Sequence, residues 1–245
     1  MSNEFLRAVD NGVAVITLNR PARLNALTST MIAGLTGLLA DCANDPDIGC
    51  VVLTGAGKGF CSGGDVAVQA ANAGKSTQSP EQRADGLRAG MEASRLLHEM
   101  PKPTIAMVNG VAAGAGMSLA LACDMRIVAE SARMTVAFAM VGLSGDYGGS
   151  YFLTRIVGPA LARELYFTSE ILTSARLERL GLASRVVPDD RLEGETMELA
   201  RKFANGPRMA WRYIKRNMKA AEEGTLADTL DSEAYGMLRD RKSVV

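Results

Sequence analysis

The sequence contains one histidine, few aromatic residues and no excess of either charge. Basic and acidic residues balance at 27 each and no basic run occurs, which disfavours nucleic acid and acidic membrane surfaces as partners. His98 stands beside Glu99 on an expected helix, and we interpret it as a surface residue. This interpretation excludes Ser/His and Cys/His nucleophiles. No cluster of His, Cys and carboxylate residues has metal-ligand spacing, so no metal site is predicted.

Cysteine is also scarce. The chain of 245 residues has four cysteines, too few for a disulfide framework: Cys42, Cys50, Cys61 and Cys123. The apolar neighbours of Cys50 and Cys123 are typical of a core. The mixed-charge start "MSNEFLRAVDN" lacks the apolar stretch of a secretory signal. These features favour a cytoplasmic protein.

One uncharged segment approaches the length of a membrane span. Residues 103–123 carry no charge, and a spanning helix needs about 20 residues. The turn dipeptide Asn109-Gly110 divides this segment, which is rich in Gly and Ala rather than Leu. We therefore interpret it as a buried strand, a turn and a buried helix of a soluble protein.

The apolar patterns predict an α/β core with a helical C-terminal appendage. Residues 5–19 predict a hairpin with its turn at residues 10–12, and the continuously apolar residues 48–55 predict a strand buried on both faces. Further strands are expected at residues 103–108, 125–130, 133–138 and 183–187, and helices at residues 28–44, 80–100 and over most of the chain after Gly149. Strands and helices alternate first and helices follow alone, which is typical of this class.

Two features of the predicted helices concern surfaces. The helix at residues 80–100 should present one apolar side, formed by Leu87, Met91, Leu97 and Met100. The last helix should carry an apolar stripe at four-residue spacing, formed by Leu226, Leu230, Ala234 and Leu238. Residues 66–80, which are small and polar, predict a mobile loop.

Two glycine-rich loops are candidates for ligand binding. Residues 54–66 follow a buried strand and contain five glycines, but they match neither phosphate-loop template. The pair Gly63-Gly64 still opens the main chain to a ligand. In the second loop, small residues at 112–116 lead directly into a helix, whose first N–H groups have no internal partner. If the two loops faced each other, their free N–H groups would form an oxyanion hole.

Asp146 is the one charged residue between Arg133 and Arg155. Two interpretations remain open. Asp146 could cap the helix that follows, or it could be a desolvated carboxylate that moves a proton, with an apolar wall formed by Phe138, Met140 and Leu143.

Five segments, taken in order and spacing, resemble the enoyl-CoA hydratase/isomerase (crotonase) superfamily: "NRPARLNAL", "GAGKGFCSGGDV", "PTIAMVNGVAAGAGMSLALACDMRIVAESARM", "VGLSGDYGGSYFLTRIVG" and "LTSARLERLGLASRVV". The resemblance covers about residues 5–245. It implies a ββα spiral core at residues 1–190 and a helical trimerisation region at residues 191–245. It also implies a homo-trimer or hexamer and an acyl-CoA thioester substrate. Coenzyme A is then part of the substrate, and no separate cofactor is expected.

The resemblance also assigns roles to residues. The oxyanion hole would be formed by the N–H groups of Gly64 and Ala115, with Gly63 and Gly114 setting the turn geometry. The nucleotide end of coenzyme A would dock at Arg20, Arg23 and Leu24, and Tyr147 would either line the acyl pocket or belong to the core. The two glutamates of the hydratases would fall at Ser118 and Phe138, so both are missing here. In double-bond isomerases of the family, a catalytic aspartate resembles Asp146.

These roles favour a double-bond isomerase. Three alternatives stay open: a hydratase whose water is held by Asp146 and Ser118, a ring-opening C–C hydrolase, and a non-catalytic acyl-CoA binder. Ser118 could equally be an ordinary helix hydroxyl bonded to the preceding turn. Family members usually continue past "DRKSVV", so a clipped or disordered tail is expected, with an incomplete adenine pocket.

Overall fold

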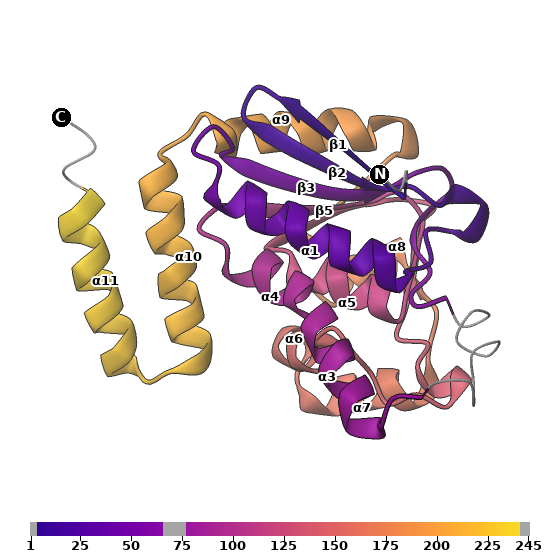
Figure 1. Cartoon of the computed structure of the whole chain (residues 1–245). Coiled ribbons are helices and arrows are strands. Elements are labelled where there is room, and N and C mark those ends of the chain that lie inside the picture. The colour runs from indigo at the N-terminus through magenta and orange to yellow at the C-terminus, as the bar shows by residue number, and fades with distance from the viewer. Residues whose placement is uncertain (1–3, 66–76, 241–245) are drawn as a thin grey trace.

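The computed structural model describes residues 4–65 and 77–240 (Figure 1). The loop predicted at residues 66–80 lies mostly outside these described residues.

The larger of two sheets is mixed and has the strand order β1-β2-β3-β5-β7-β10. The predicted N-terminal hairpin is confirmed, because β1 and β2 pair antiparallel. All later neighbours run parallel. The strands are β1 (Phe5–Asp10), β2 (Val13–Leu18), β3 (Cys50–Gly55), β5 (Thr104–Val108), β7 (Met125–Ala129) and β10 (Arg185–Val187). Every residue of β3 and β5 is buried, as expected for parallel strands covered on both faces.

A smaller sheet of four short strands was not predicted in full. Its order is β4 (Gly59–Cys61), β6 (Val111–Ala113), β8 (Arg133–Thr135) and β9 (Leu172–Thr173). Strands of two or three residues are too short to show an alternating pattern, which is why β4, β6 and β9 escaped the sequence analysis. Each of β3, β5 and β7 is followed directly by a strand of this sheet. The chain therefore forms an α/β spiral of ββα units, as expected.

Helices cover both faces of the large sheet. α1 (Ser29–Asn44) begins where Thr28 Oγ accepts a hydrogen bond from the Met31 N–H at 3.0 Å. α9 (Leu192–Ala204) contacts β3, β5 and β7 and lies above the sheet in Figure 1, with α1 below it. Further α-helices are α5 (Ala115–Ala122), α6 (Gly149–Val157), α7 (Pro159–Thr168), α8 (Ser174–Arg179), α10 (Arg208–Glu223) and α11 (Leu226–Asp240). The short 3-10 helices are η1 (Pro21–Arg23), η2 (Ala139–Val141) and η3 (Asp189–Arg191).

The single helix predicted at residues 80–100 is two helices, α3 (Pro80–Gly90) and α4 (Glu92–Glu99). The helix breaks at Met91, directly after Gly90, a residue type that weakens a helix interior. The predicted apolar side is also wrong in its first half, because Leu87 is exposed and α3 buries no residue. Residues 103–123 form β5, β6 and α5. Within the described ranges, no helix is long and apolar enough to cross a membrane.

The hairpin of α10 and α11 stands beside the rest of the chain (Figure 1). Long polar side chains attach it: Lys215 Nζ donates to Asp124 Oδ2 at 2.8 Å, and Lys219 Nζ to Glu99 Oε1 at 2.5 Å. The predicted stripe on α11 is not covered by the chain itself, since Leu226 is 74% exposed and Leu238 72%. So large an exposed apolar surface calls for a partner surface.

We therefore expect the protein to assemble as a homo-trimer or hexamer through α10 and α11. Light scattering at micromolar concentration should return a multimer mass. Leu230→Glu should weaken assembly at least tenfold, because it would place an unpaired charge in an apolar interface. Leu6→Glu, at an exposed leucine of edge strand β1, serves as the matched control. A monomer mass for the unmodified chain would contradict the expectation.

Candidate active site

The two glycine-rich loops pack backbone against backbone. A Cβ added at Gly116 would lie 2.1 Å from the Cys61 carbonyl oxygen, and one at Gly63 would lie 2.9 Å from the Ala113 carbonyl oxygen and 3.5 Å from the Ala115 nitrogen. Contacts this short are open only to glycine. The loops that follow β3 and β5 therefore face each other, which the sequence analysis could state only as a condition.

The orientation of Gly64 follows from a short bridge to Leu27. Leu27 N–H donates to the Gly63 carbonyl at 2.7 Å, and Asp65 N–H donates to the Leu27 carbonyl at 3.1 Å. In such a parallel bridge, the middle residue of the three, here Gly64, points its own N–H and C=O groups away from the partner segment. Accordingly, the N–H of Gly64 donates to no acceptor among the described residues. It is held facing away from Leu27.

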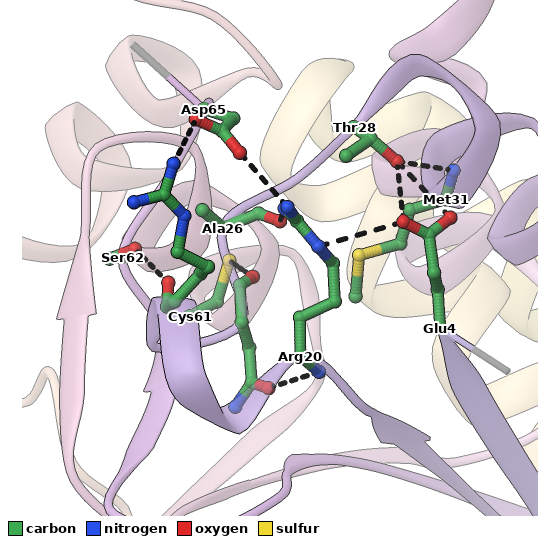
Figure 2. Close-up of polar contacts among 10 residues, drawn as sticks. Glu4, Arg20, Ala26, Thr28, Met31, Cys61, Ser62 and Asp65 are labelled. Atoms are coloured by element: carbon green, nitrogen blue, oxygen red, sulfur yellow. Dashed lines mark hydrogen bonds and ion pairs between the residues drawn. The ribbon is translucent and has the colours of Figure 1, made fainter. Parts of the chain in front are cut away.

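Arg20 braces this bridge (Figure 2). Its guanidinium donates to the Ala26 carbonyl at 2.5 Å and to Asp65 Oδ2 at 3.0 Å, and its Nε lies 3.5 Å from Glu4 Oε1. Asp65 is buried, so an arginine must neutralise it. The sequence analysis placed Arg20 at the coenzyme A docking site and did not pair it with Asp65, because 45 residues separate the partners and no local pattern links them.

Ala115 is the first residue of α5, and its N–H has no intrahelical partner. The hydrogen bonds of the described residues include none that this N–H donates. Gly114 precedes it with φ +51°, a left-handed conformation, and its own N–H donates to Thr135. The N–H groups of Gly64 and Ala115 thus belong to two contacting loops, and neither donates to an acceptor among the described residues.

Asp146 does not cap the following helix. The N-cap of α6 is Gly148, without a side-chain cap hydrogen bond, so the capping interpretation is wrong. The Oδ1 atom of Asp146 is buried and has no hydrogen-bond partner among the described residues. Burial raises the pKa of this carboxyl from 3.8 to about 6, because desolvation disfavours the charged form.

The groups that shield the Asp146 carboxylate from solvent differ from those predicted. Met140 and Leu143 are 72% and 49% exposed, and they lie on either side of Gly142, which ends η2 with φ +71°. Burial, followed by the Asp146 charge, raises the pKa of Tyr147 and of Tyr166, so these two aromatic rings lie within range of the carboxylate. The predicted apolar wall is wrong for Met140 and Leu143.

Tyr147 is buried in a strained conformation. Its φ is +50°, a region that non-glycine residues rarely adopt, and its hydroxyl has no partner among the described residues. A Cβ at Gly90 would lie 3.4 Å from that hydroxyl oxygen, so the ring reaches back to the end of α3. Strain of this kind is frequent at functional sites.

Ser118 and Phe138 line one small cavity, although 20 residues separate them in the sequence. Ser118 Oγ donates to the Gly114 carbonyl at 3.2 Å, the bond expected for a helix hydroxyl. Phe138 is buried and stacks on Tyr166, with ring centroids 6.2 Å apart and an interplanar angle of 11°. Tyr166 was missed by the sequence analysis, since no motif marks α7.

Arg23 and Leu24 lie at the rim of the first glycine loop. The Arg23 side chain is mostly exposed, with Nη2 4.0 Å from Asp65 Oδ1. Leu24 adopts φ +46° and packs against Gly59. Both residues are accessible to a ligand that approaches the loop from solvent.

Two further interpretations can be compared with the structure. His98 is half-buried rather than fully exposed: its ring packs edge-on against Phe152 at 5.2 Å, and its Nε2 is buried without a partner among the described residues. The core position of Cys61 is confirmed. Its Sγ donates to the Asn25 carbonyl at 3.2 Å, and burial raises its pKa to about 12, which leaves an inert thiol.

The comparisons with known proteins identify the family. The enoyl-CoA hydratase/isomerase family profile matches residues 8–241. The chain is 38% identical over 233 residues to the 1,2-epoxyphenylacetyl-CoA isomerase of Escherichia coli, covering 95% of this chain and 88% of that protein. It is 34% identical over 239 residues to the short-chain-enoyl-CoA hydratase of Clostridium acetobutylicum, covering 96% and 88%.

A solved structure agrees with these relatives. The crystal structure of an enoyl-CoA hydratase from Polaromonas sp. JS666 superposes with a TM-score of 0.90 at 33% identity, covering 96% of this chain and 91% of that one. The protein belongs to the enoyl-CoA hydratase/isomerase family and has the crotonase fold. Its relatives include both an isomerase and hydratases, so the family alone does not decide between these reactions.

The burial of Asp146 predicts a pH-dependent stability. The folded carboxyl has a raised pKa, so the unfolded carboxyl ionises first, and the wild type loses stability as pH rises from about 4 through 6. We expect Asp146→Asn to be more stable than the wild type at pH 8 by about 1–2 kcal/mol, after allowing for partial solvation. The difference should vanish below about pH 4.

Urea unfolding at pH 4, 6 and 8, at one protein concentration, measures this difference. An Asn variant that is less stable than the wild type at pH 8 would mean that the ionised carboxylate has partners, and the burial argument would then be wrong.

Proposed function

We propose that the protein shifts a double bond in an unsaturated acyl-CoA thioester. Asp146 takes a proton from the γ-carbon and returns it to the α-carbon, or the reverse. One carboxylate suffices, because both carbons lie on the same face of the dienolate. The observation that carries this proposal is the buried, unpaired Oδ1 of Asp146. A pKa near 6 suits a group that must accept and release a proton near neutral pH.

The N–H groups of Gly64 and Ala115 would hold the dienolate oxygen. The support for this role of the two N–H groups is geometric. The loops are in contact, and neither N–H donates to an acceptor among the described residues. Donors that are already in place stabilise the developing charge without reorganisation. Gly63 and Gly114, both with positive φ, would set the geometry of the two loops.

The hydratase reaction has less support. Hydration needs a base for the water and an acid for the α-carbon. At the two positions where hydratases of the family would carry glutamates, this chain has Ser118 and Phe138, and neither side chain can fill such a role near neutral pH. Asp146 is then the one carboxylate left for the chemistry, and it supports proton transfer within the substrate.

The substrate's coenzyme A would dock over the exposed Arg23 and Leu24, with the Arg23 guanidinium near a phosphate. Tyr147 would line the acyl pocket. Residues 1–190 would carry this site, and residues 191–245 would assemble the protein. The Escherichia coli relative is named as an isomerase of an epoxyacyl-CoA, which supports isomerisation of a CoA thioester in general, whereas the name of the Clostridium relative supports the hydratase alternative.

Asp146→Asn tests the proton shuttle. Turnover should fall roughly 10²–10⁴-fold, the share that a general base supplies. Thioester affinity should stay within about twofold, because the backbone donors and the coenzyme A contacts remain. The assay follows washing of α- and γ-protons of an enoyl thioester into deuterated water, together with titration calorimetry for binding.

Asp85→Asn on α3 is a matched control that removes an exposed carboxylate. If Asp146→Asn exchanged protons at the wild-type rate, Asp146 would not be the shuttle. A wild-type protein that binds the thioester without exchanging any proton would be an acyl-CoA binder.

Hydration gives an independent prediction. The protein should hydrate crotonyl-CoA slowly, since acid and base are each worth roughly 10²–10⁴-fold and neither glutamate is present. Loss of the enoyl thioester absorbance measures the rate. A turnover of about 10 s⁻¹ or above, typical of enzymes, would establish the hydratase alternative.

A further inference from the structure

Two hydroxyl groups point at one spot beside the candidate active site. A Cβ added at Gly149 would lie 2.4 Å from Ser118 Oγ and 2.8 Å from the Tyr166 hydroxyl oxygen. Ser118 belongs to α5, behind the Gly114 turn, and Tyr166 belongs to α7. The absence of a side chain at Gly149 lets both hydroxyls approach the first turn of α6.

The same two hydroxyls line the small cavity between these helices. They are the polar side-chain groups of its lining, which otherwise consists of glycines and apolar side chains: Gly114, Met117, Leu121, Val136, Phe138, Gly149 and Leu153. The cavity has a volume of about 10 Å³, close to the minimum for one water-sized group. It is too small for a further stretch of alkyl chain, and its size and polarity suit a single hydroxyl.

The two groups offer complementary hydrogen bonds. Ser118 Oγ uses its proton to donate to the Gly114 carbonyl at 3.2 Å, so toward the cavity it offers lone pairs. The Tyr166 hydroxyl is both a donor and an acceptor, and a neutral phenol can donate its proton into the cavity. One acceptor and one donor match a hydroxyl, which both donates and accepts.

The Tyr166 ring is fixed where this contact would form. It stacks on Phe138, and a Cβ at Gly145 would lie 3.2 Å from its Cε1. Burial, followed by the Asp146 charge, raises its pKa to about 12, so the phenol stays neutral near pH 7. Gly145, against which the ring lies, directly precedes Asp146 in the sequence, and the Asp146 charge acts on Tyr166, so the hydroxyl pair lies near the proposed proton shuttle.

We propose that Ser118 Oγ and Tyr166 OH form a subsite for one hydroxyl group on the acyl chain. The preferred substrates are then unsaturated acyl thioesters that carry a hydroxyl near the reacting carbons. This inference rests on the proposed function, since it requires an acyl-CoA ligand beside Asp146. Ser118 and Tyr166 determine specificity in it and do not move the proton.

Binding rather than turnover tests the subsite. Titration calorimetry compares butanoyl-CoA with 4-hydroxybutanoyl-CoA and with each enantiomer of 3-hydroxybutanoyl-CoA. At least one hydroxyacyl thioester should bind the wild type roughly tenfold more tightly than butanoyl-CoA, as expected for a buried hydrogen-bonded hydroxyl. Tyr166→Phe keeps the stacked ring and should abolish this preference, so that the hydroxyacyl thioester and butanoyl-CoA bind about equally well. The affinity for butanoyl-CoA should not change. Ser118→Ala should act in the same way.

Tyr213→Phe is the matched control, because it removes a hydroxyl from another buried tyrosine, on α10, and should keep the preference. If all four thioesters bind the wild type equally, the pair holds only a water and the subsite is refuted, while the proposed function stands. A preference that survives both Tyr166→Phe and Ser118→Ala also refutes it. If butanoyl-CoA and the hydroxyacyl thioesters all fail to bind, the proposed function and the subsite both fall.

Discussion

The close approach of the two glycine loops is the constraint on which the rest of the site depends. Gly116 lies against the Cys61 carbonyl, and Gly63 lies against the Ala113 carbonyl. A methyl group at either position would have to displace backbone, not a mobile side chain. The parallel order of β3 and β5 brings both loops to the same edge of the sheet. Both unpartnered N–H groups belong to this contact.

The same arrangement includes unfavourable backbone conformations and buried polar atoms without hydrogen bonds. Leu24, Ala137 and Tyr147 adopt positive φ, and the Asp146 oxygen and the Tyr147 hydroxyl are buried without partners among the described residues. Such strain persists only where surrounding packing enforces it. The bridge through Leu27 and the Arg20–Asp65 ion pair supply that packing on one side of the site, and the stack of Phe138 on Tyr166 supplies it on the other.

Local signals made much of the fold predictable, and long-range contacts made the rest unpredictable. The hairpin turn at residues 10–12 and the Thr28 cap act on their immediate neighbours, so the sequence displays them. The loops could be located, but their contact depends on the register of strands far apart in sequence. Tyr166 was missed for the same reason, since it reaches the site only because α7 folds back against η2. The prediction of an apolar wall failed for Met140 and Leu143, because both are exposed beside the left-handed turn at Gly142, and an apolar side chain in the sequence does not show which way it faces.

The residue at position 138 affects the electrostatics of Asp146. Phe138 stacks on Tyr166, and Tyr166 feels the charge of Asp146, so residue 138 and Asp146 share a neighbour. A glutamate at position 138 would bring a second negative charge into this dry space and push the pKa of Asp146 above its value of about 6. If Asp146 is the proton shuttle proposed above, it would then be largely protonated near pH 7 and a poor base. The proposal therefore requires an uncharged residue at position 138.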